Sequence, residues 1–201
     1  MALNDYITRD ASSFSNLKSL LPYARNMQSY IAGGVFKDIF QKQTYKDIDI
    51  FFENEKAFLE YKNQIIRSNN YSSLYNNQNA LGFYNSNENI SIDLVQKKFG
   101  DPLEILESFD FSVSKFCLYR EEYNYYKVIY HKHFFEDLVN RTLRFDSSKS
   151  DPVSQLSRVI RYSRYGFKIN KSDYLNLLKR INEMTPDIFE DLSMDEIYSY
   201  Y

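Results

Sequence analysis

The chain has 201 residues, 43% hydrophobic and 26% charged, which is typical of one globular domain or of a domain with a small appendage. Its 25 Lys and Arg residues against 27 Asp and Glu residues give a net charge of −2. This balance excludes a strongly basic nucleic-acid coat protein and a strongly acidic disordered protein. The sequence shows neither a run of about 18 apolar residues nor a basic-then-apolar leader. We therefore expect no membrane contact and a cytoplasmic location.

Two features of the composition are informative. The single cysteine, Cys117, excludes an intramolecular disulfide and a cysteine-based zinc site, and we interpret it as a small core residue. The abundance of Tyr, Asn, Lys and Ile is typical of an A/T-rich genome, such as that of a phage or a low-GC bacterium. The 19 tyrosines could stack bases, but their even scatter favours core and surface filling.

The predicted elements of the first hundred residues alternate between strands and helices. They are inferred from apolar spacing, from alternation and from asparagine-rich turns. In chain order they are a leading helix after an N-cap signal at Asp10, a strand at 29–32, a turn at 33–34, a helix at 35–40, a strand at 47–52, a helix at 55–67, a hairpin with strands at 71–75 and 80–84, and a strand at 90–95.

The second half of the chain changes character near residue 133. Its predicted elements are a helix from Asp101 to Leu106, an edge strand at 126–130, and helices at 134–143, 152–165 and 172–184. We therefore divide the chain into a mixed head, residues 1–133, and a helical C-terminal extension, residues 134–201.

Charge is distributed unevenly along the helical extension. Residues 140–180 hold ten basic and three acidic side chains, and an acidic, Tyr-rich end follows that we expect to be mobile or loosely docked. Arg158, Arg161 and Arg164 recur at three-residue spacing, so they line either a ligand wall or a solvated stripe. His131 and His133 would point to the same side of a strand; a surface pair is favoured over a metal site.

Three carboxylates mark the candidate site. Asp47 and Asp49 share one face of a predicted strand, and Asp93 lies on a second strand. Crowded carboxylates repel one another and are costly to desolvate, so stability alone rarely explains them. A pair of divalent cations would explain the arrangement, because two Mg²⁺ ions held by shared carboxylates form the clamp for in-line phosphoryl transfer. Gly33 and Gly34, just upstream, would let the backbone come close to phosphates.

At these residues the chain resembles the nucleotidyltransferase head domain of bacterial poly(A) polymerases and CCA-adding enzymes of the class II type. Residues 33–38, followed by 46–50, are similar to the Gly-Gly-x-x-Arg-Asp and Asp-x-Asp signature of that family. Looser similarity follows at Asp93, 110–114, 137–144 and 151–167, so the resemblance covers about residues 28 to 170. It implies an α+β, DNA polymerase β-like nucleotidyltransferase fold: a short mixed sheet flanked by helices, with a helical C-terminal extension.

The resemblance also implies an activity, the Mg²⁺-dependent transfer of a nucleoside monophosphate from an NTP such as ATP to a hydroxyl acceptor at an RNA or tRNA 3′ end; Mn²⁺ could replace Mg²⁺. Asp47 and Asp49 would ligate both metals, and Asp93 would complete the acceptor-side metal site and help deprotonate the hydroxyl. The implied nucleotide-binding residues are Gly33, Gly34, Lys37, Arg158 and Arg161.

The chain departs from the family pattern at several positions. Lys37 stands where the family has Arg, which keeps the charge but loses bidentate phosphate geometry. Ser108 and Phe109 replace an arginine pair, and Ser114 replaces an Asn. The family's nucleotide-selecting and tRNA-holding helical domains would lie beyond residue 201, so we do not expect CCA addition.

Two alternatives remain open at this stage. In the first, catalysis is lost and the fold serves as a binding or structural module, with a protein partner in a phage particle or in a defence and counter-defence complex. In the second, the same site belongs to a toxin that modifies tRNA with nucleotides. Whether the three carboxylates converge would distinguish an enzyme from the first alternative. Only the identity of the acceptor would reveal the toxin of the second alternative.

Overall fold

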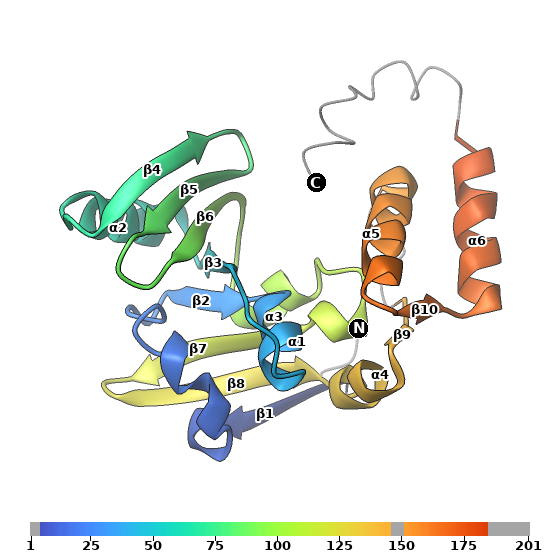
Figure 1. Cartoon of the computed structure of the whole chain (residues 1–201), viewed down its shortest axis with the longest axis horizontal. Helices are drawn as coiled ribbons and strands as arrows, with labels where there is room; N and C mark the ends of the chain where they lie inside the picture. Colours follow the sequence, from blue (N-terminus) through green and yellow to red (C-terminus); the bar gives the residue numbers. More distant parts are fainter. Residues whose placement is uncertain (1–4, 146–150, 185–201) are drawn as a thin grey trace.

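The computed structural model describes residues 5–145 and 151–184. Its centre is an eight-stranded mixed sheet in the order β1-β8-β7-β2-β3-β6-β5-β4, shown in Figure 1. The strands are β1 (Tyr6–Asp10), β2 (Ser29–Ala32), β3 (Asp47–Phe52), β4 (Tyr71–Asn76), β5 (Ala80–Asn85), β6 (Ile90–Phe99), β7 (Phe116–Glu122) and β8 (Tyr125–His131). Neighbouring strands are antiparallel except β3 and β6, which are parallel. The α+β fold class expected from the sequence is confirmed.

Helices cover the sheet and extend it at one side. The α-helices are α1 (Val35–Phe40), α2 (Glu55–Ile66), α3 (Pro102–Leu106), α4 (Phe134–Asn140), α5 (Pro152–Arg164) and α6 (Lys171–Asn182). In Figure 1, α5 and α6 stand side by side beyond the end of the sheet that carries α4. A two-stranded parallel pair, β9 (Thr142–Leu143) and β10 (Lys168–Ile169), joins the segments on either side of α5.

Local sequence explains where the helices begin. The side chain of Asn54 accepts a hydrogen bond from the backbone of Ala57 at the start of α2, and that of Asp151 caps α5, where Pro152 follows. Asp101 and Glu104 cap each other's backbone at the start of α3. Each capping signal lies within a few residues of the helix that it begins, so the sequence alone predicted the bounds of α2, α3 and α5 closely.

Elements held by distant contacts differ from the prediction. The leading helix predicted after Asp10 is instead two short 3-10 helices, Ala11–Ser13 and Ser15–Leu20, and strand β1, which was not predicted, precedes them. The strand predicted at 126–130 exists as β8, but the prediction that it forms an edge is wrong, because β1 pairs with its outer side. Strand β7 was not predicted, although it lies between β8 and β2. The sheet is therefore larger than the short one expected.

The main hydrophobic core runs continuously from the sheet into the helices after it. Phe116 on β7 lies at its centre, with its ring within 4.5–5.2 Å, centroid to centroid, of the rings of Phe36, Phe40, Tyr130 and Phe134. The same core includes residues after position 133, among them Leu143, Val159, Phe167 and Leu177. Cys117 is buried in a smaller core with α3 on the opposite face, as expected. The division of the chain at residue 133 remains a prediction.

Two further expectations can be placed on this fold. Among the described residues, no helix combines the length and the apolar character needed to cross a membrane. The acidic C-terminal end falls mostly at 185–201, outside the described residues.

Candidate functional site

The candidate site begins with the parallel pairing of β3 and β6. Their register places Asp49 directly beside Asp93, and Asp47 beside Ser91. Because side chains alternate along a strand, Asp47 and Asp49 lie on the same face of β3. All three carboxylates line a cavity of about 700 Å³ that also receives residues from α1 and α5. The fold thus brings together, in one cavity, the three acidic residues singled out from the sequence.

Burial and mutual repulsion disturb the ionisation of two of these acids. The pKa of Asp49 is raised to about 7, first by burial, then by the neighbouring charges of Asp93 and Asp47. Arg161 and Lys97 partly offset this shift. The pKa of Asp93 is also raised, chiefly by burial. A site with this excess of negative charge favours a bound cation or a cationic ligand.

The donor chemistry of the cavity fits a divalent ion, because carboxylate oxygens are the ligands that Mg²⁺ and Mn²⁺ prefer. Yet within residues 5–145 and 151–184 no three His, Cys, Asp or Glu side chains are arranged as a ready ligand group. Asp47, Asp49 and Asp93 therefore share a cavity and influence one another's charge without forming such a group. Their role as metal ligands remains a prediction.

The predicted glycine turn lies next to the carboxylates. Gly33 directly follows β2 and has a φ of +99°, a conformation that L residues rarely adopt. A Cβ atom there would lie 3.4 Å from Oδ2 of Asp49 and 3.5 Å from the ring of Phe109. Gly34 lines the cavity, and a Cβ atom there would meet open space. Backbone conformation therefore favours glycine at position 33, whereas a Cβ atom there would make only ordinary van der Waals contacts with Asp49 and Phe109.

Lys37 lies on α1 at the cavity wall and is almost fully buried. Its ammonium group forms an ion pair with Asp38. The same group lies 4.7 Å from the centre of the Tyr165 ring, which follows α5. Any phosphate bound by Lys37 would have to share the lysine with these two neighbours.

The two arginines assigned to nucleotide binding occupy different settings on α5. Arg158 forms an ion pair with Asp110, which is 4% exposed and also accepts a hydrogen bond of 3.1 Å from Gln155. Arg161 lines the cavity and acts electrostatically on Asp49. Both arginines line the cavity, but Arg158 also attaches the helix to the head through Asp110, whereas Arg161 offsets the charge of Asp49.

Sequence reasoning missed several lining residues that contribute charge or hydrogen bonds, among them Tyr75, Lys97 and Tyr165. Lys97 continues the alternation of Asp93 and Val95 along β6, so a longer predicted strand would have found it. Tyr165 immediately follows the arginine stripe. Nothing local in the sequence indicates Tyr75, because its position depends on strand pairing.

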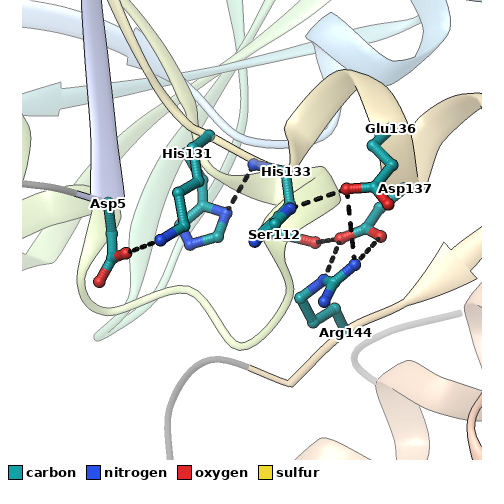
Figure 2. A network of polar contacts seen from close by, with 8 residues as sticks. Asp5, Ser112, His131, His133, Glu136, Asp137 and Arg144 are labelled. Carbon is teal, nitrogen blue, oxygen red and sulfur yellow. Dashed lines mark hydrogen bonds and ion pairs between the residues drawn. The ribbon is translucent and has the colours of Figure 1, made fainter.

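A second polar cluster, shown in Figure 2, lies around the start of α4. Asp137 is 1% exposed and accepts hydrogen bonds from Arg144, at 2.9 and 3.0 Å, and from Ser112, at 2.5 Å. His131 is buried, which corrects the predicted surface pair, and its Nδ1 accepts a bond from the backbone of His133. These contacts join β8, α4 and the segment before α5.

Comparison with known proteins adds family and fold. The sequence profile described as "Gad2: Gabija anti-defense 2 family protein" matches residues 4–141. The chain belongs to this family. A curated protein named "Gabija anti-defense 2", from Bacillus phage SPbetaL7, is 23% identical over 176 residues. That alignment covers 87% of this chain and 42% of the phage protein, so the chain spans less than half the length of this curated relative of the anti-defense family.

Solved structures of CCA-adding enzymes share the fold of this Gabija anti-defense 2 family chain. A complex with ATP superimposes with a TM-score of 0.72 at 18% identity, covering 96% of this chain and 50% of the other. A complex with CTP gives a TM-score of 0.71 at 19% identity, covering 95% and 50%. The Thermotoga maritima enzyme bound to tRNA gives 0.64 at 19% identity, covering 88% and 46%. The chain thus has a nucleotidyltransferase-like fold.

Proposed function

We propose that the chain is a metal-dependent nucleotidyltransferase that transfers a nucleoside monophosphate from an NTP to a hydroxyl acceptor, an RNA or tRNA 3′ end. The observation that carries this proposal is the placement of Asp47, Asp49 and Asp93 in one cavity, against the Gly33 turn and facing Arg161. Similarity in fold to CCA-adding enzymes solved with ATP, CTP and tRNA supports the substrate class.

The reaction assigns a task to each part of the cavity. An acceptor oxygen forms a bond to the α-phosphorus, the bond from that phosphorus to the oxygen bridging the β-phosphate breaks, and pyrophosphate leaves. Asp47, Asp49 and Asp93 would hold Mg²⁺ or Mn²⁺, which when bound supplies positive charge for the hydroxyl and for the leaving group. Asp93 would receive the acceptor's proton. Arg161 and Lys37 would neutralise the phosphates, and the backbone at Gly33 and Gly34 would let them approach.

The chain's membership of the Gabija anti-defense 2 family suggests a biological role for this activity. The phage relative is named for its action against the Gabija defence, and we propose that this chain acts for a phage in the host cytoplasm by modifying its acceptor.

Two observations favour the alternative of an inactive binding module. In the described part of the chain the three acids form no ready ligand group, and Lys37 and Arg158 are already engaged by Asp38 and Asp110. A module of this kind would bind a defence protein without turnover.

The decisive experiment incubates the protein with radiolabelled NTPs, Mg²⁺ and total cellular RNA, and follows the label. We expect label in RNA, and its loss by at least about 100-fold when Asp47 and Asp49 are both replaced by Ala, because metal binding and charge neutralisation fail together. Calorimetric titration with Mn²⁺ and an NTP accompanies the assay. Equal nucleotide binding by wild type and double variant, with no label transferred by either, would establish the binding module instead.

A further inference from the structure

Four residues, one on each of four neighbouring strands, form a row that connects the Asp49 and Asp93 carboxylates with the side chain of Tyr75. Tyr75 on β4 is paired with Gly82 on β5, Gly82 with Asp93 on β6, and Asp93 with Asp49 on β3. We propose that Tyr75 is a positioning residue that holds the Asp93 carboxylate, through its hydroxyl group, in the orientation that binds a divalent ion. This inference rests on the proposed function and adds a residue that the signature motifs do not contain.

An irregularity in β4 places Tyr75 in this row. Ser73 pairs with Phe83, but the next pair is Tyr75 with Gly82, so Leu74 is skipped and lies 51% exposed. Such a bulge shifts every later side chain of the strand by one position relative to its partner. Without it, Tyr75 would lie opposite Leu81, whose side chain belongs to the main core rather than to the cavity. The bulge therefore directs Tyr75 toward the acids.

The missing side chain of Gly82 leaves room for the ring of Tyr75 to cross β5. A Cβ atom on Gly82 would lie 2.3 Å from Cε1 of Tyr75 and 2.6 Å from Cδ1 and Cζ, distances that no real side chain tolerates. The ring thus lies directly over the glycine backbone and crosses β5 to reach β6. Gly82 has no unusual φ, so its lack of a side chain matters here through space alone.

The hydroxyl group of Tyr75 meets Asp93 at the end of this path. Both side chains line the cavity, and the influence of Tyr75 lowers the pKa of Asp93, which offsets part of the rise caused by burial. A phenol is protonated at neutral pH and can donate to a carboxylate. A contact of this kind leaves the other lone pairs of Asp93 for a cation. Partners of this kind fix the direction of metal-binding carboxylates and commonly alter affinity or activity 10–100-fold.

The test compares Tyr75→Phe, which removes only the hydroxyl group, with Tyr84→Phe as a matched control. Tyr84 lies on β5, and its hydroxyl bonds Asn89 outside the cavity. Mn²⁺ affinity is measured without nucleotide by electron paramagnetic resonance, alongside kcat and KM for the NTP. We expect Tyr75→Phe to weaken Mn²⁺ binding about 10-fold and to lower kcat with KM unchanged, whereas Tyr84→Phe matches wild type.

A second variant keeps the hydroxyl group and displaces it. Gly82→Ala should push the ring from its path, weaken Mn²⁺ binding to a similar extent, and add little when combined with Tyr75→Phe, because both changes break one contact. Unchanged or tighter Mn²⁺ binding by Tyr75→Phe overturns the inference. So does weaker Mn²⁺ binding that is seen with Tyr75→Ala but not with Tyr75→Phe, because the aromatic ring and not the hydroxyl group would then be the part that acts, by stacking. If wild type neither binds Mn²⁺ nor transfers nucleotide, the proposed function itself fails, and this inference fails with it.

Discussion

Asp49 is a candidate site residue that lowers the stability of the folded protein at neutral pH. Its pKa is raised to about 7 from 3.8, because burial and two neighbouring acids oppose its charge. Between these two pH values the unfolded chain releases a proton that the folded chain retains, so this residue makes folding less favourable as pH rises, with the full penalty above pH 7. Below pH 4 the penalty disappears. A residue that lowers stability at working pH is better explained by chemistry than by architecture.

Replacing Asp49 by Asn should therefore stabilise the protein at pH 8. We expect a gain of about 1–2 kcal/mol, lower than the pKa shift alone implies because solvent reaches the open cavity, and a rise in Tm of about 3–6 °C. Near pH 4 the gain should vanish, and nucleotidyl transfer should be lost at either pH. Thermal melts across this range measure the effect. Glu60→Gln on the exposed surface of α2 is the control and should change little; a gain independent of pH would contradict the argument.

Residue spacing predicted part of this site and could not predict the rest. Alternation within a single strand placed Asp47 and Asp49 on one face, and alternation within a second strand singled out Asp93, which the family resemblance then matched to a third metal-binding carboxylate. Tyr75 was beyond reach because its position depends on a bulge in β4 and on a bare glycine in β5. Both features arise only once the hairpin has paired.

At the scale of elements, prediction succeeded where signals are local and failed where pairing is distant. Caps and apolar spacing located α2, α3 and α5 to within a few residues. Strand β7 begins with three consecutive buried residues, Phe116–Leu118, and ends in charged ones, so it shows neither alternation nor helical spacing. Strand β1 is short and largely exposed, and only its pairing with β8 holds it in place. That pairing is also what makes β8 an interior strand.

The attachment of α5 to the head yields a prediction about stability. Asp110 is buried and receives Arg158 and Gln155 from that helix. Arg158→Met should cost about 2–3 kcal/mol, because it leaves a buried carboxylate with too few partners. Adding Asp110→Asn should recover part of that loss, since the uncompensated charge is then removed. Urea unfolding of the two single variants and the double variant measures the coupling; strictly additive losses would show that the ion pair does not hold the helix.

At the scale of the whole molecule, shared fold and shared family support different conclusions. Likeness to CCA-adding enzymes below 20% identity establishes architecture, whereas the profile match over residues 4–141 establishes the anti-defense family. A fold can be retained while its site changes, so the acids and their surroundings must carry the functional argument. Here the acids, the glycine turn and Arg161 support the proposed transfer chemistry, whereas Lys37 and Arg158 are engaged by Asp38 and Asp110.

The continuity of the core predicts how the molecule unfolds. Leu177 on α6 is 2% exposed and belongs to the same hydrophobic cluster as Phe36 and Ile50 of the head. Head and extension should therefore unfold together in one transition, with equal calorimetric and van't Hoff enthalpies. Leu177→Ala should lower stability by about 2–4 kcal/mol and move that single transition down by roughly 5–12 °C. Scanning calorimetry of the full chain tests this. A variant that splits the melt into two transitions would show instead that the helices after residue 133 fold as a separate unit.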